Sequence, residues 1–150
     1  MRTRWRLAKK ADVLDVGSRM RQADIDEGWA MLGVEPLDWL THFDPQRTWV
    51  IYNSHNDNVA LAGTNPIDDD TAMIWMVATD DLEKHSIEFL KHSRPFIEEI
   101  TAPYALTFNW VHAANEVHLK WLKWCGFTFI QKHEVFGARG EPFYTFCRIT

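Results

Sequence analysis

A run of almost uninterrupted apolar residues lies in the middle of the chain. Residues 71–79 read TAMIWMVAT, and acidic residues follow directly. Successive side chains of a strand point to opposite faces of its sheet, so a strand that is apolar at nearly every position must be covered on both faces. The sequence therefore predicts a central strand that other elements cover from two sides.

The segments before this strand alternate between strand-like and helical patterns. A first helix is expected to start at Asp12 and a second at Asp24, because aspartate side chains cap the free N–H groups of a helix start. Gly33 is expected to end the second helix, with Leu32 among its inward-facing residues. The expected segments are, in order, a strand at 3–8, helices at 12–20, 24–32 and 36–43, and a hairpin with strands at 49–52 and 59–63.

The segments after the central strand complete the order. The longest helix is expected to start at Asp80, because Asp80 and Glu83 have the spacing of a capping box, and Pro95 is expected to kink or break it. A strand at 104–112, a helix from Asn115 and strands at 127–133 and 143–149 follow. This order predicts an α+β fold in one domain, residues 1–150, with a mixed sheet of six to seven strands and helices on both faces.

Charge and cysteine content exclude several classes of protein. The net charge of −5 argues against a nucleic-acid partner, and the arginines that alternate along the first strand are expected on the solvent side of an edge strand. The two cysteines lack the spacing of a metal or redox motif, which favours buried thiols in a reducing compartment. No apolar run approaches the roughly 20 residues that cross a bilayer, so no membrane span is expected.

Eight tryptophans are many for a chain of 150 residues. Large aromatic side chains can fill a core, or they can line a ligand slot or a protein interface. Both interpretations are open on the sequence alone.

The segment NEVHLKWLKWCGF, residues 115–127, carries a family pattern. Asn115 at the helix start, Trp121 and Leu122 within it, and the ending Gly126-Phe127 match a helix that is common in the Gcn5-related N-acetyltransferases, the GNAT family. The order of the elements resembles that family too. Several stretches, NWVHAAN above all, resemble GNAT-like proteins of short-tailed bacteriophages, which include internal virion proteins. The resemblance implies a GNAT-like phage protein in the host bacterial cytoplasm or the virion.

The resemblance also implies a cofactor, acetyl-CoA, and an amine acceptor of unknown identity. In GNAT proteins, backbone N–H groups between the central strand and the next helix hold the pyrophosphate. The matching segment, VATDDLEKHS, makes Val77, Thr79, Lys84 and His85 candidate cofactor-binding residues. Asn109 and Asn115 flank the region where two strands of this fold separate. They are candidates for binding a pantetheine amide.

Two features depart from the family pattern. The segment 77–86 contains no glycine and carries acidic residues at the helix start, where a helix dipole would otherwise attract an anion. Leu122 stands where the family commonly has a tyrosine acid. Two hypotheses are therefore open: an acetyltransferase, or a catalytically inactive GNAT-fold protein with an assembly, virion or host-interaction role. An open slot between strands 72–78 and 104–110 favours the first, and a slot filled by Trp75, Met76 or Trp110 favours the second.

Glu27 and His118 are the candidate catalytic residues. A carboxylate that faces the cleft can accept the proton of an amine, and a histidine titrates near neutral pH. A surface carboxylate and a structural histidine are the simpler explanations of the same residues. Because no Cys/His spacing resembles a zinc site, no metal is expected. Further expected partners are a phage or host protein and a second copy of the chain, paired through a sheet edge.

Overall fold

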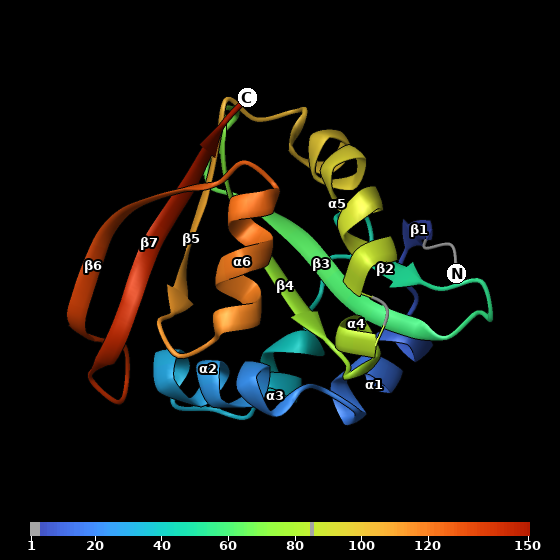
Figure 1. The fold of residues 1–150 in the computed structure, drawn as a ribbon, viewed down its shortest axis with the longest axis horizontal. Helices are drawn as coiled ribbons and strands as arrows, with labels where there is room; N and C mark the ends of the chain where they lie inside the picture. Colours follow the sequence, from blue (N-terminus) through green and yellow to red (C-terminus); the bar gives the residue numbers. More distant parts are fainter. Residues whose placement is uncertain (1–3, 85) are drawn as a thin grey trace.

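The computed structural model describes residues 4–84 and 86–150. Within these residues, seven strands form one mixed sheet in the order β1-β2-β3-β4-β5-β7-β6 (Figure 1). The strands are β1 (Arg4–Leu7), β2 (Thr48–Tyr52), β3 (Asn58–Pro66), β4 (Thr71–Ala78), β5 (Leu106–His112), β6 (Thr128–Phe136) and β7 (Glu141–Ile149). The helices are α1 (Lys10–Ser18), α2 (Gln22–Leu32), α3 (Pro36–Leu40), α4 (Asp81–Lys84), α5 (Ser86–Thr101) and α6 (Glu116–Trp124).

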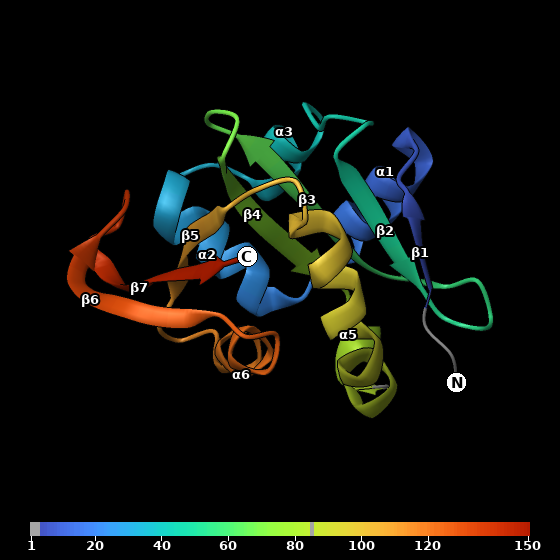
Figure 2. The same ribbon diagram turned by 90° about the horizontal axis from the view of Figure 1, so that it is seen from above.

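Helices cover both faces of the sheet, as the sequence predicts. Helices α1, α2 and α3 lie on one face, and α5 and α6 lie on the other (Figure 2). Side chains of β4 alternate between two cores: Ile74 and Met76 pack with α5 and α6, whereas Val77 packs with α1 and α3. The strand is buried from both sides, which explains why residues 71–79 are apolar at nearly every position.

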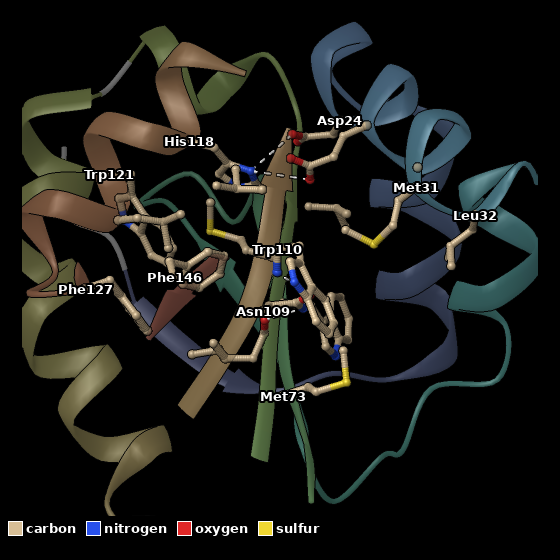
Figure 3. A pocket seen from close by; sticks show the side chains of 18 of the residues that line it. Asp24, Met31, Leu32, Met73, Asn109, Trp110, His118, Trp121, Phe127 and Phe146 are labelled. Atoms are coloured by element: carbon tan, nitrogen blue, oxygen red, sulfur yellow. Dashed lines mark hydrogen bonds and ion pairs between the residues drawn. The ribbon is translucent and has the colours of Figure 1, made fainter. Parts of the chain in front are cut away.

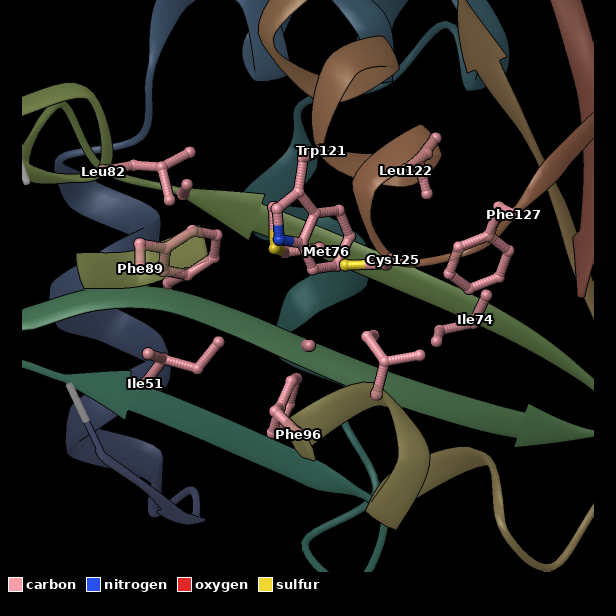
Figure 4. Packing of buried hydrophobic residues seen from close by; sticks show 14 of the residues in the cluster. Ile51, Ile74, Met76, Leu82, Phe89, Phe96, Trp121, Leu122, Cys125 and Phe127 are labelled. Atoms are coloured by element: carbon pink, nitrogen blue, oxygen red, sulfur yellow. The ribbon is translucent and has the colours of Figure 1, made fainter. Parts of the chain in front are cut away.

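Large aromatic rings fill the core beneath α5 and α6 (Figure 4). Trp121 of α6 lies 6.0 Å from Phe89 of α5 between ring centroids, and its indole N–H donates to Ser93 Oγ at 2.9 Å. That hydrogen bond satisfies a buried polar group that would otherwise be costly. Part of the tryptophan excess therefore serves packing.

Edge strands and cysteines partly follow the expectations. Strand β1 lies at one edge of the sheet and exposes its arginines, as expected. Cys125 is buried as expected, whereas Cys147 is only half-buried. Among the described residues, no helix combines the length and the apolar character that crossing a membrane requires.

Several predicted helix boundaries are wrong. Asp12 and Asp24 occupy the third helical position, because α1 starts at Lys10 and α2 at Gln22. Asp12 Oδ2 accepts from the backbone N of Lys9 at 2.8 Å, so it closes the helix start from inside the first turn. Gly33 ends α2 in a left-handed conformation, as predicted, but Leu32 is 52% exposed rather than inward-facing.

The helix expected from Asp80 corresponds to α4 and α5, which lie on either side of His85, a residue outside the described ones. Pro95 lies inside α5 but does not end it, since the helix continues to Thr101. Phe96 and Ile97, directly after the proline, are 1% and 0% exposed. Burial of this face compensates for the backbone hydrogen bond that proline removes.

Candidate functional site: a cavity between two diverging strands

Strands β4 and β5 run side by side for a short distance and then separate (Figure 1). Their parallel pairing extends from Thr71–Leu106 to Met73–Phe108. Beyond this point, Asn109 Nδ2 crosses the gap and donates to the backbone oxygen of Ile74 at 2.8 Å. A strand edge that leaves its sheet exposes backbone donors and acceptors. The divergence therefore creates an edge to which a ligand can hydrogen-bond.

A cavity of about 210 Å³ occupies this gap (Figure 3). Residues of α2 and α3 line it from one face of the sheet, and residues of α6 line it from the other. Trp75, Met76 and Trp110 form part of its wall and do not fill it. The cavity thus connects the two faces of the sheet through the opening between β4 and β5.

Two carboxylates and a histidine meet at one end of the cavity (Figure 3). Asp24 and Glu27 are three residues apart on α2, which places them on the same face of that helix. His118 comes from α6, and its Nδ1 lies 3.6 Å from Asp24 Oδ1 and 3.9 Å from Glu27 Oε2. The site thus combines candidate catalytic residues that are 91 positions apart in the chain.

Asp24 is held by three donors. Arg21 Nη1 lies 3.1 Å from Asp24 Oδ1, and the Ala78 backbone N donates to Asp24 Oδ2 at 2.9 Å. Asn115 Nδ2 donates to Asp24 Oδ1 at 3.0 Å. The side chains of Arg21 and Asp24 are 5% and 1% exposed. Asp24 therefore anchors α2 to the end of β4 and to the start of α6.

Asn115 determines the orientation of His118 and does not cap its helix. It occupies the position before α6, as predicted, but its side chain makes no capping hydrogen bond. Its NH₂ group faces Asp24, and the same group lies 3.1 Å from His118 Nδ1. In this orientation of the amide, Nδ1 accepts from the NH₂ group, which assigns the proton of the neutral ring to Nε2. Burial lowers the pKa of His118, which favours this neutral form.

Glu27 is the carboxylate best placed to exchange a proton. Its Oε1 accepts from the His112 backbone N at 2.8 Å, and its side chain is 16% exposed at the cavity wall. Burial, and to a lesser extent the charge of Asp24, raises the pKa of Glu27 to about 8. A carboxyl group with a pKa near the working pH is suited to general-base catalysis.

The same three side chains also have the composition of a metal site, which the sequence did not indicate. Asp24, Glu27 and His118 offer ligand atoms within 4.8 Å of one another. However, both oxygens of Asp24 already accept hydrogen bonds, and one of them faces the Arg21 guanidinium. A cation there would meet a positive charge at short range. The arrangement therefore suits proton exchange better than metal binding.

Arginines from another part of the chain lie beside the acidic start of α4. Asp81 lies 3.5 Å from Arg19 and 3.7 Å from Lys84, and Glu83 lies 3.3 Å from Arg21. The sequence analysis did not connect either arginine with this helix start, because both precede α2 in the chain. The repulsion expected between this helix start and an anion is therefore weaker than the local sequence predicts.

The predicted cofactor-binding residues are only partly brought together. Val77 and Asn109 line the cavity. Thr79 Oγ1 donates instead to the Val59 backbone oxygen at 3.1 Å, and Lys84 is 69% exposed at α4. Asn115 contacts His118 and is not among the residues that line the cavity. The cavity wall thus contains the strand residues, whereas the helix-start residues lie outside it.

Leu122 faces the cavity from α6 and is 4% exposed. The position at which the GNAT pattern commonly places a tyrosine therefore does face the gap between β4 and β5. Here it presents methyl groups, which cannot donate a proton.

Comparisons with solved structures place this fold among acetyltransferases. A GNAT-family acetyltransferase from Bacillus anthracis superposes with a TM-score of 0.71 at 9% identity, over 99% of this chain and 95% of that one. An aminoglycoside N(6')-acetyltransferase from Legionella pneumophila gives 0.72 at 14% identity, over 99% and 92%. A spermidine N-acetyltransferase from Vibrio cholerae, solved with CoA and spermine, gives 0.65 at 14% identity, over 99% and 95%. No protein-family model and no curated protein matches the sequence. The chain therefore has the GNAT fold, as predicted.

Proposed function

We propose that the protein transfers an acetyl group from acetyl-CoA to an amine. The observation that carries this proposal is the open cavity between β4 and β5, with the carboxyl group of Glu27 in its wall. A fold alone does not define an activity, so the argument rests on this site. The cavity is open, whereas a slot filled by side chains would have favoured the hypothesis of an inactive protein.

The opening fits the arm of the cofactor. Ala78 N and Ile74 O both bond across the free edge of β4, and the alternation of a strand places the Met76 N–H and C=O on the same edge. Ala78 N and Ile74 O already have partners, so the Met76 N–H and C=O would hold a pantetheine arm beside Asn109. Arg19 and Lys84 would stand beside its phosphate end, close to the start of α4.

The chemistry requires one proton acceptor in the protein. Acetyl-CoA supplies a thioester whose acetyl carbon bonds to the amine nitrogen while its C–S bond breaks. Glu27 takes the proton that the ammonium group of the acceptor must lose, and the His112 N–H holds the carboxylate in position. Because a thiol has a pKa of about 8.5, a thiolate can leave without an acid and then take the second proton, which the nitrogen loses as the amide forms, so Leu122 does not prevent the reaction.

Two measurements test the proposal. Isothermal titration with acetyl-CoA should show binding, and release of free thiol on addition of primary amines should report transfer. Glu27→Gln should lower kcat by about 100-fold or more, the usual contribution of a general base, with little change in acetyl-CoA affinity. Glu98→Gln, an exposed carboxylate on α5, is the matched control. Failure to bind acetyl-CoA at millimolar concentration would contradict the proposal.

Leu122 and the glycine-free segment 77–86 favour the second candidate, a GNAT-fold protein without catalysis. Such a protein would act in phage assembly, in the virion or on a host protein, either alone or as a homodimer. The resemblance to phage proteins supports this origin and a place in the bacterial cytoplasm. If acetyl-CoA does not bind, and the purified protein instead associates with phage structural proteins, the second candidate replaces the first.

A further inference from the structure

The two ends of the cavity differ in chemistry. Asp24, Glu27 and His118 lie at one end. Three half-buried tryptophans line the cavity elsewhere: Trp39 from α3, Trp75 from β4 and Trp110 from β5. The ring centroids of Trp39 and Trp75 are 5.3 Å apart in an edge-on contact, and those of Trp110 and Phe136 are 5.4 Å apart. An aromatic wall thus adjoins a carboxylate.

The Trp75 part of this wall packs against the backbone of the neighbouring strand β3. A methyl group on Gly63 of β3 would lie 2.6 Å from atoms of the Trp75 indole, so the ring lies directly over this glycine. Such a contact requires the absence of a side chain at position 63. Trp75 therefore packs against the strand beside it, and it also lines the cavity.

The charge in the cavity matches a single ammonium group. Among the cavity-lining residues that the structure describes, the carboxylates are Asp24 and Glu27. Asp24 is paired with Arg21, which leaves Glu27 to meet a cationic ligand, whose positive charge would favour the ionised form of the Glu27 carboxyl group. The remaining wall is mostly aliphatic and aromatic, with Asn65, Asn109 and His118 as polar exceptions.

We propose that the acceptor is a primary amine joined by a short chain to an aromatic ring. Its nitrogen lies at Glu27, and its ring lies against Trp75 and Trp110. Aromatic rings pack favourably at these centroid distances, beyond the gain from burial alone. A polyamine or an aminoglycoside would instead place further ammonium or hydroxyl groups against apolar side chains, where they lose their hydration. This inference rests on the proposed function, because it names the acceptor of that reaction.

Calorimetric titration tests the inference without acyl transfer. Phenethylamine, hexylamine and spermidine are titrated into the protein, both alone and with CoA present. Phenethylamine should bind at least about tenfold more tightly than spermidine, and about three- to tenfold more tightly than hexylamine, which has one charge but no ring. Equal or tighter binding of spermidine, or equal binding of hexylamine, would overturn the inference. So would the absence of phenethylamine binding under both conditions.

Substitutions at Trp110 provide the second test. Trp110→Ala should weaken phenethylamine binding by about tenfold and hexylamine binding by less, whereas Trp110→Phe should retain most of the affinity for phenethylamine. Trp124→Ala, which removes a 40% exposed tryptophan outside the cavity wall, is the matched control and should leave both affinities unchanged. Equal effects of Trp110→Ala and Trp124→Ala would contradict the assignment of the ring site.

The failures of the two proposals can be told apart. If phenethylamine binds as described but acetyl-CoA does not, the aromatic amine site stands and acyl transfer is wrong. If acetyl-CoA binds and transfer to another amine class is faster, acyl transfer stands and the acceptor class is wrong.

Discussion

Asn109 connects the two strands that separate at the cavity, because its Nδ2 donates to the Ile74 backbone oxygen across the gap at 2.8 Å. Its Oδ1 accepts from the Trp110 backbone N at 2.8 Å, so both ends of the amide are used. The side chain thereby replaces a hydrogen bond that the β4–β5 ladder would have made. It gives the Ile74 carbonyl at the edge of β4 a hydrogen-bond partner at the point where the two strands separate.

Asn109→Ala should destabilise the protein by about 1–3 kcal/mol, because a partly buried carbonyl and a partly buried N–H lose their partners. Urea denaturation followed by circular dichroism measures the change in the free energy of unfolding. Asn65→Ala, on the exposed end of β3, serves as control and should change it by less than about 0.5 kcal/mol. Similar values for both variants would show that the crossing hydrogen bond contributes little.

Glu27→Gln should make the protein more stable at alkaline pH while removing the proposed activity. The pKa of Glu27 is about 8 in the folded protein against an ordinary value of 4.5, so the folded state keeps a proton that the unfolded chain releases between these values. The free energy of unfolding of the unsubstituted protein therefore falls as pH rises from about 4.5 to 8. Glutamine stays neutral, which should give the variant an advantage of a few kcal/mol at pH 8.5 and little near pH 5.

Denaturation curves of both proteins from pH 5 to 9 measure this difference. The exposed Glu98→Gln variant should follow the unsubstituted protein across the whole range. Parallel curves for Glu27→Gln and the unsubstituted protein would mean that the Glu27 carboxyl group titrates normally.

Arg21→Gln should cost about 3–5 kcal/mol, because it leaves the buried carboxylate of Asp24 without its cationic partner. Arg47→Gln removes an ion pair whose side chains are 44% and 39% exposed, and it should cost far less than Arg21→Gln. Thermal unfolding in low and high salt separates the two effects. Salt should reduce the contribution of the exposed pair and leave that of the buried pair nearly unchanged.

Gly137→Ala should disturb the contact between the β6–β7 turn and α2. Backbone N–H groups of this turn donate to Met31 O at 3.0 Å and Ala30 O at 3.2 Å, which closes the end of α2. Gly137 has a φ of 74°, and a methyl group there would lie 2.6 Å from Ala30 O. We expect a loss of at least about 2 kcal/mol, from backbone strain together with the steric conflict.

Gly140→Ala is the matched control for that variant. Its φ of 62° is also positive, but the nearest atom is a flexible valine methyl at 3.2 Å. Its cost in denaturation experiments should be limited to backbone strain, about 1 kcal/mol. A larger loss for Gly140→Ala than for Gly137→Ala would contradict the proposed contact.

Patterns of neighbouring residues predicted most of the fold. The apolar run at 71–79 correctly predicted a strand buried on both faces, and Gly33 correctly predicted a helix end. Helix starts were predicted less well, because Asp12 and Asp24 lie at the third position of their helices and not at the start. Pro95 was predicted to kink or break its helix, and α5 continues past it to Thr101, where burial of Phe96 and Ile97 supports the helix.

The candidate site was only partly predictable. Glu27, His118 and Asn109 were identified as single residues from their chemistry. Their environment was not, because Arg21, Asp24 and Asn115 meet only when α2 docks against β4 and α6. Similarly, the acidic start of α4 indicated repulsion of an anion, whereas Arg19 and Arg21 approach it from the segment between α1 and α2.

The sequence by itself determined the secondary structure, the two-sided burial of β4 and the resemblance to the GNAT family, since these depend on the spacing of residues along the chain. Only the tertiary structure decided whether the gap between β4 and β5 is open, which carboxylate lies in it and what its pKa is. Those properties depend on burial and on charges a few ångströms away, which belong to residues far apart in sequence. Leu122 illustrates the division: the sequence showed that it carries no proton donor, and the structure showed that it faces the cavity.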